Sequence, residues 1–77
     1  MTHQPTDHEI EVIAAWWWAV GSNVRAAFLL GRAEQTIKNT LYQLRKVHAA
    51  DTNVELVHRY FRQVQKHRKS MQQKAVA

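Results

Sequence analysis

Side chains suited to contacts with nucleic acid recur between residues 34 and 48. The polar and aromatic residues that share one side of a helix there are Gln35, Lys38, Asn39, Tyr42 and Lys46. Ile37, Leu41 and Leu44 alternate with them at i, i+4 and i+7, so a helix here would bury one face and expose the other. Glutamine and asparagine suit paired hydrogen bonds with adenine. We therefore expect a helix at about residues 34–48 that enters the major groove of duplex DNA.

Basic residues flank this stretch and dominate the second half of the chain. Arg25 and Arg32 precede the expected helix, and Arg45 and Lys46 lie near its end. Ten of the eleven Lys and Arg residues fall within residues 31–77, together with three of the six acidic residues. This surplus of positive charge favours a polyanionic partner, whose phosphates would supply affinity and salt dependence rather than sequence choice. The simpler alternative is a solvated basic surface.

The composition gives little support for catalysis or metal binding. The 77 residues include no cysteine, which excludes disulfides and thiolate zinc sites. Five histidines are scattered along the chain without an HxxxH pair, and no glycine-rich phosphate loop is present. We therefore expect a protein that is not an enzyme, with no catalytic residues, no cofactor and no metal site.

No segment has the character of a membrane anchor. The longest apolar run, Val12–Val20, has nine residues, far short of the roughly 20 that a membrane-spanning helix needs. Residues 1–7 are polar and contain no run typical of a signal peptide. The expectation is a cytoplasmic protein that makes no membrane contact.

Caps and apolar periodicity predict four helices and no strand, which makes the expected fold class all-α. Thr6 with Glu9, and Thr52 with Glu55, have the spacing of capping boxes. A short second helix would begin after Ser22 and end at Gly31. The four predicted helices cover residues 6–20, 23–30, 34–48 and 52–66.

The length allows one small domain. Residues 1–5 are expected to be disordered, residues 6–66 to form the domain, and residues 67–77 to form a basic flexible tail. A chain of this size buries only about 60–65% of its unfolded surface, so a partner often completes the core.

The pattern from Thr6 to about Val57 resembles the LuxR/GerE type of tetrahelical helix-turn-helix domain. The positions that carry the resemblance are Thr6, Glu9, Val12, Ile13, Ser22-Asn23, Ala27, Leu30, Thr36-Ile37-Lys38, Leu41, Leu44, Thr52-Asn53 and Leu56-Val57. The resemblance implies a DNA-binding domain, adds Thr36 to the expected DNA contacts and places Lys38 beside the start of the recognition helix. Region 4 of sigma factors shares the same three core helices and is an alternative.

The sequence departs from that family pattern at three places. Val20 occupies the position of a glycine that precedes the second helix, and Gly21 follows it. Ala33 replaces the serine that caps the recognition helix, so this helix should lack its side-chain cap. Lys46-Val47 stands where the family has Lys-Leu at the end of that helix.

Three consecutive tryptophans, residues 16–18, cannot all face one core, because neighbouring helical residues are 100° apart. Trp17 falls on the stripe of Ile13 and is expected in the core, with Trp16 at its boundary and Trp18 the most exposed. Trp16 and Trp18 are therefore candidate contacts for a protein partner. The alternative is that Trp18 folds flat over the domain edge.

The fourth predicted helix carries an apolar seam with 3-4-3 spacing, typical of a helix that packs along another helix. The expected dimer interface comprises Val54, Val57, His58, Phe61 and Val64. Part of this seam could instead pack on the domain core. In proteins of the family that the sequence resembles, the fourth helix is the dimer contact, which favours a two-fold homodimer.

Three functions remain in competition. The leading hypothesis is a sequence-specific transcription regulator that binds double-stranded DNA as a dimer. The second is a small protein-interaction adaptor that uses the tryptophan-rich first helix, its basic face being incidental. The third is binding to a membrane surface through the basic tail.

Overall fold

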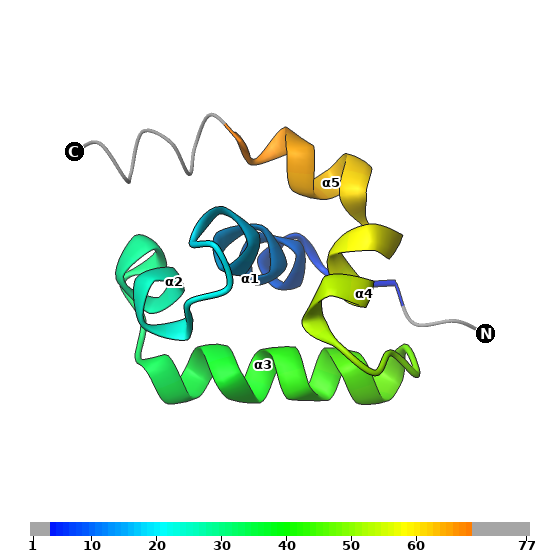
Figure 1. Ribbon diagram of the computed structural model, residues 1–77, viewed down its shortest axis with the longest axis horizontal. Helices are drawn as coiled ribbons and strands as arrows, with labels where there is room; N and C mark the ends of the chain where they lie inside the picture. The colour runs from blue at the N-terminus through cyan, green and yellow to red at the C-terminus, as the bar shows by residue number, and fades with distance from the viewer. Residues whose placement is uncertain (1–3, 69–77) are drawn as a thin grey trace.

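The computed structural model describes residues 4–68, which form five α-helices (Figure 1). The helices are α1 (Asp7–Trp18), α2 (Asn23–Leu30), α3 (Glu34–Val47), α4 (Asn53–Arg59) and α5 (Phe61–Lys66). No strand occurs within residues 4–68, so the predicted all-α fold class is confirmed. Residues 1–3 and 69–77, which hold most of the predicted disordered start and basic tail, lie outside the described residues.

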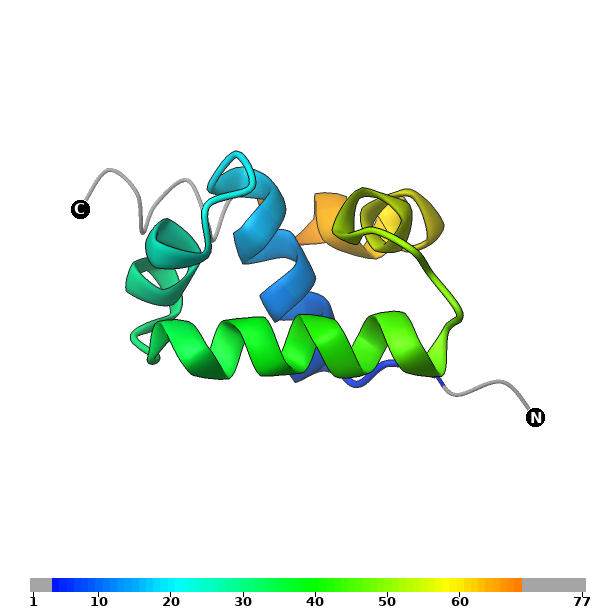
Figure 2. The ribbon, with the colours of Figure 1, turned by 60° about the horizontal axis from the view of Figure 1, so that its bottom comes forward.

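Helix α1 lies at the centre of the domain, and the other four helices all pack against it (Figures 1 and 2). The predicted capping box begins it: the Glu9 N–H donates to the Thr6 hydroxyl at 3.2 Å, and the Thr6 N–H donates to the Glu9 carboxylate at 2.8 Å. The fully buried side chains of α1 are Val12, Ile13, Ala14 and Ala15. Four consecutive residues span about 300° around a helix, so α1 is enclosed on nearly all sides along this stretch.

Helices α2 and α3 are joined by a short turn and pack against each other. The Ser22 hydroxyl accepts a hydrogen bond from the Arg25 N–H at 3.2 Å, and Gly31 ends α2 in the left-handed conformation with φ 64°. Ala26 and Ala27 are buried in the domain, and their small side chains allow close approach of the neighbouring helices. Helix α3 runs along one edge of the domain, and its outer side is not covered by another helix (Figures 1 and 2).

The prediction of one continuous fourth helix is wrong, because the chain bends at Tyr60 and divides this segment into α4 and α5. Tyr60 has φ −113° and ψ 29°, outside the helical region. The bend brings α5 onto α1, where Val64 is fully buried. The second capping box is only half formed, since the Glu55 carboxylate accepts from the Asp51 N–H rather than from Thr52.

Polar contacts hold this bend against the end of α3. The Tyr60 hydroxyl lies 2.8 Å from Nδ1 of His48, and the two rings meet edge to face with centroids 5.2 Å apart. The Arg59 guanidinium donates to the His48 carbonyl and also pairs with the Glu55 carboxylate at 3.3 Å. Burial raises the pKa of the Tyr60 phenol above its ordinary value; Arg59 opposes this shift and Glu9 adds to it.

The turn between α1 and α2 contains a strained valine. Val20 has φ 56°, in the left-handed region that a β-branched residue rarely adopts. Its side chain is 88% exposed, so little packing offsets the strain. Gly21 follows at φ 77°, and a Cβ there would lie 3.4 Å from the Trp16 ring. A glycine at position 20 would remove the strain, because glycine adopts a positive φ without steric cost.

Tyr60→Phe should lower the free energy of unfolding by about 1 kcal/mol at neutral pH, because the hydrogen bond to His48 is lost. A raised pKa means that the folded protein favours the neutral phenol. This contribution is therefore complete below the ordinary tyrosine pKa and is lost as the pH rises through the raised value. Urea unfolding should show a difference between parent and variant that shrinks at alkaline pH. Tyr42→Phe, at the exposed tyrosine of α3, is the control, and an equal loss in both variants would contradict the prediction.

Val20→Gly should raise the free energy of unfolding by about 1 kcal/mol, because relief of the left-handed strain exceeds the entropy that glycine adds to the unfolded chain. Thermal unfolding followed by circular dichroism measures the change. Val24→Gly replaces another exposed valine, but inside α2, and should destabilise the protein by about 0.5 kcal/mol. A lower Tm for Val20→Gly would show that the valine conformation is not strained.

Candidate nucleic-acid interface

The outer side of α3 carries a row of exposed side chains, here called the α3 stripe. It lies opposite Ile37, Leu41 and Leu44, which are buried and anchor the helix. The residues of the α3 stripe are Gln35, Lys38, Asn39, Tyr42, Gln43 and Lys46. Gln43 was not predicted as a site residue, although its spacing of four from Asn39 places it on the same side of the helix.

Two amide side chains of the α3 stripe are joined by a hydrogen bond. Nε2 of Gln35 donates to Oδ1 of Asn39 at 2.9 Å. The pair still offers the Gln35 oxygen as an acceptor and the Asn39 nitrogen as a donor. An adenine edge in the major groove presents one acceptor and one donor, so the joined amides match its hydrogen-bonding pattern.

Positive charge gathers around Tyr42. Nζ of Lys46 lies 5.5 Å from the centre of the Tyr42 ring, and the Arg45 guanidinium lies 5.9 Å from it, both within the range of cation–π attraction. Lys38, one turn earlier, pairs with the Glu34 carboxylate at 3.4 Å. Both partners of that ion pair are exposed, so the pair is weak and a phosphate can replace the carboxylate.

A polar groove of about 320 Å³ runs beside the α3 stripe, between α3 and the first residues of α2 and α4. Its lining residues are Asn23, Lys38, Asn39, Leu41, Tyr42, Arg45 and Asn53. Arg45 donates to the Asn53 side chain and is held between α3 and α4. Within the described residues, the buried Oδ1 of Asn23 has no hydrogen-bond partner.

Asn23 and Asn53 were not predicted as site residues. Each is the first residue of its helix and follows a residue that was identified as a cap, Ser22 or Thr52. This shared position, directly after a predicted cap residue, is the sequence feature that could have identified both asparagines. It could not show that both asparagines meet the side of α3, since this depends on how three helices pack.

Three other predicted DNA contacts are Arg25, Arg32 and Thr36, and they do not all lie in the same part of the structure. Arg32 and Thr36 are exposed beside the start of α3. Arg25 instead lines a small pocket with Trp18 and Phe28, and this pocket shares no residue with the polar groove. Arg32 and Thr36 are therefore near the start of α3 in the chain, whereas Arg25 belongs to a different pocket.

The predicted order of exposure among the tryptophans is wrong. Trp17 is the most exposed at 37%, whereas Trp16 and Trp18 are half-buried. Trp17 does lie on the predicted stripe, but it comes at the end of α1, where α4 and α5 leave a groove instead of a close contact. Trp18 packs beside α2, and the Arg68 guanidinium lies 5.9 Å from the centre of its ring.

The predicted dimer interface also needs correction. Val57 and Val64 are buried where α4 and α5 pack on α1, so neither is available to a second copy. Val54, His58 and Phe61 remain exposed. The seam is thus divided between the core and the surface, which the 3-4-3 spacing alone could not decide.

Within residues 4–68, no three His, Cys, Asp or Glu side chains come close enough together to hold a metal ion. None of the helices in that range has both the length and the apolar character needed to cross a bilayer. No protein-family model matches the sequence, and no curated protein or solved structure is significantly similar to it.

The start of α3 lacks a side-chain cap, because Ala33 occupies the N-cap position with ψ 145°. Ala33→Thr should raise the free energy of unfolding by about 1 kcal/mol, since the new hydroxyl can accept from the Gln35 or Thr36 N–H. Urea unfolding measures the change. Ala33→Val has nearly the same shape without the acceptor and is the matched control. Equal stabilities of the two variants would exclude a capping effect.

Proposed function

We propose that this chain is a sequence-specific transcription regulator that inserts α3 into the major groove of duplex DNA. The main support is the α3 stripe, which faces solvent because Ile37, Leu41 and Leu44 fix the opposite side of the helix in the core. A recognition helix needs this combination of a rigid apolar anchor and an outward row of donors and acceptors.

The dimensions of α3 suit this role. Its 14 residues make a helix about 21 Å long, and its outer side is uncovered (Figure 1). A major groove about 12 Å wide admits one α-helix. The domain can therefore approach DNA with α3 in front and α1 behind it.

Different residues would supply affinity and sequence choice. The Gln35–Asn39 pair is suited to one adenine, and Tyr42 lies beside the same row of base edges. Lys46 and Arg32 carry positive charge toward the phosphates on either side of the groove. Phosphate contacts would set affinity and salt dependence, whereas the amides would set the preferred sequence.

A single copy is the DNA-binding unit in this proposal. Val57 and Val64 of the expected dimer interface are buried in the core of a single copy. Of that interface, only Val54, His58 and Phe61 remain exposed for contact with a second copy. An adaptor that uses only the tryptophan helix is less well supported, because Trp16 and Trp18 are half-buried and the α3 stripe would have no role.

The Lys38→Ala/Asn39→Ala double variant tests DNA binding by α3. A preferred duplex is first selected from random DNA with the full chain. The variant should bind that duplex about tenfold or more weakly, because a phosphate contact and a base contact are lost. Its preference over a scrambled duplex should fall, and the slope of log K against log salt should decrease by about one. Fluorescence anisotropy at several salt concentrations measures all three quantities.

Arg62→Ala is the matched control, because it also removes one positive charge but lies on α5, away from α3. It should keep the sequence preference of the parent, and circular dichroism should show that every variant is folded. The proposal fails if random DNA yields no preferred sequence. It also fails if Arg62→Ala and the double variant lose their preference for the selected duplex to the same extent.

A further inference from the structure

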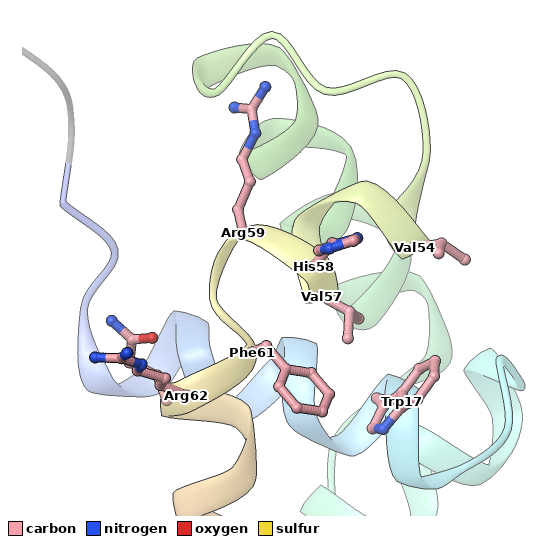
Figure 3. A pocket seen from close by; sticks show the side chains of 8 residues that line it. Trp17, Val54, Val57, His58, Arg59, Phe61 and Arg62 are labelled. Atoms are coloured by element: carbon pink, nitrogen blue, oxygen red, sulfur yellow. The ribbon is translucent and has the colours of Figure 1, made fainter.

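An apolar groove of about 670 Å³ lies between α1, α4 and α5 (Figure 3). Its lining residues are Trp17, Val54, Val57, His58, Arg59, Phe61, Arg62 and Gln63. Val54 is 56% exposed, and Phe61 is 46% exposed, with its ring directed toward Trp17. None of the lining residues belongs to α3, so the groove is separate from the proposed DNA-binding surface.

The residues that line this groove include two arginines, Arg59 and Arg62, and the histidine His58. His58 lies next to the apolar side chains, and Arg59 and Arg62 lie at the margin away from Trp17 (Figure 3). No carboxylate lines the groove within the described residues. Arg59 pairs with Glu55 and supports the bend, whereas Arg62 has no ion pair or hydrogen bond with another described residue.

This chemistry disfavours a second copy of the chain as the occupant. A symmetric contact would bring two sets of basic side chains together, and opposed like charges cost free energy. It would also join two molecules that each carry a formal net charge of +5. A partner with apolar anchors and negative flanks would complement both features of the groove.

We propose that this groove docks an acidic amphipathic helix of a partner protein. Leucine or phenylalanine side chains at i, i+3 or i+4, and i+7 would cover Trp17, Val54 and Phe61, as in other helix-in-groove complexes. Glutamate or aspartate beside these anchors would face Arg62 and His58. The contact would be made while α3 is bound to DNA, because the two surfaces share no residue.

The test uses the full chain labelled with ¹⁵N and a synthetic helical peptide that has leucine anchors flanked by glutamates. A second peptide has lysine in place of every glutamate. The acidic peptide should shift the NMR signals of the Trp17 indole and of the backbone at Phe61, and the lysine peptide should bind at least about fivefold more weakly. Equal binding of the two peptides, or shifts confined to α3, would overturn the proposal.

Charge reversal gives the sharper comparison. Arg62→Glu should reverse the preference and favour the lysine peptide, whereas Lys46→Glu, the same charge change on α3, should leave the preference as it is in the parent. Phe61→Ser should weaken the acidic peptide about tenfold, because an apolar contact is lost. Should Phe61→Ser fail to fold, the exposed Arg62→Glu variant still decides the question. Unchanged preference in Arg62→Glu would overturn the proposal.

The other possible occupant of the groove is a second copy of this chain. Analytical sedimentation of the parent and of Phe61→Glu measures whether the protein is a monomer or a dimer. The proposal expects a monomer in both cases. A parent dimer that Phe61→Glu separates into monomers would show that a second copy fills the groove, and would overturn the proposal. Duplex DNA binding, measured separately with Phe61→Ser and Phe61→Glu, should keep the sequence preference of the parent, so failure of this inference would leave the proposed function of α3 standing.

Discussion

The enclosure of α1 is the constraint on which the rest of the structure depends. A chain of 77 residues has little apolar surface to bury, and four of the fifteen hydrophobic residues buried in the described part of the chain follow one another at residues 12–15. Each of the other four helices packs against this one helix. Ala14 and Ala15 allow close approach because their side chains are small. The surfaces that this packing leaves uncovered include the outer side of α3 and the groove at the end of α1.

The core also determines which side of α3 faces solvent. A shift of one residue would rotate the helix by 100° and bring Lys38 or Tyr42 toward the place of an aliphatic anchor. A buried, unpaired lysine costs far more than the few contacts that rotation would gain. At its other end, α3 is held through His48, whose ring and carbonyl contact Tyr60 and Arg59. The α3 stripe therefore has one orientation before any ligand binds.

The sequence patterns correctly predicted features that depend on contacts between residues close together in the chain. The caps at Thr6 and Ser22, the end of α2 at Gly31 and the buried face of α3 all involve residues within one or two helical turns, and all are confirmed. The α3 stripe was predictable for the same reason. The bend at Tyr60 was not, because its partner His48 is twelve residues away and the apolar spacing suits a continuous helix. The polar groove beside α3 requires three helices to meet, which periodicity cannot show.

The two exposed surfaces differ in chemistry in the way that nucleic-acid and protein interfaces differ. The α3 stripe is polar and basic, as is typical of wet contacts with DNA, whereas the groove exposes Trp17 and Phe61. Direct contacts nevertheless fix the positions of the two surfaces relative to each other. Arg45 contacts Asn53, and Arg59 contacts the end of α3 at His48, so α4 cannot rotate freely against α3. A helix docked in the groove would therefore be held in one orientation relative to α3, because these contacts tie α4 to α3.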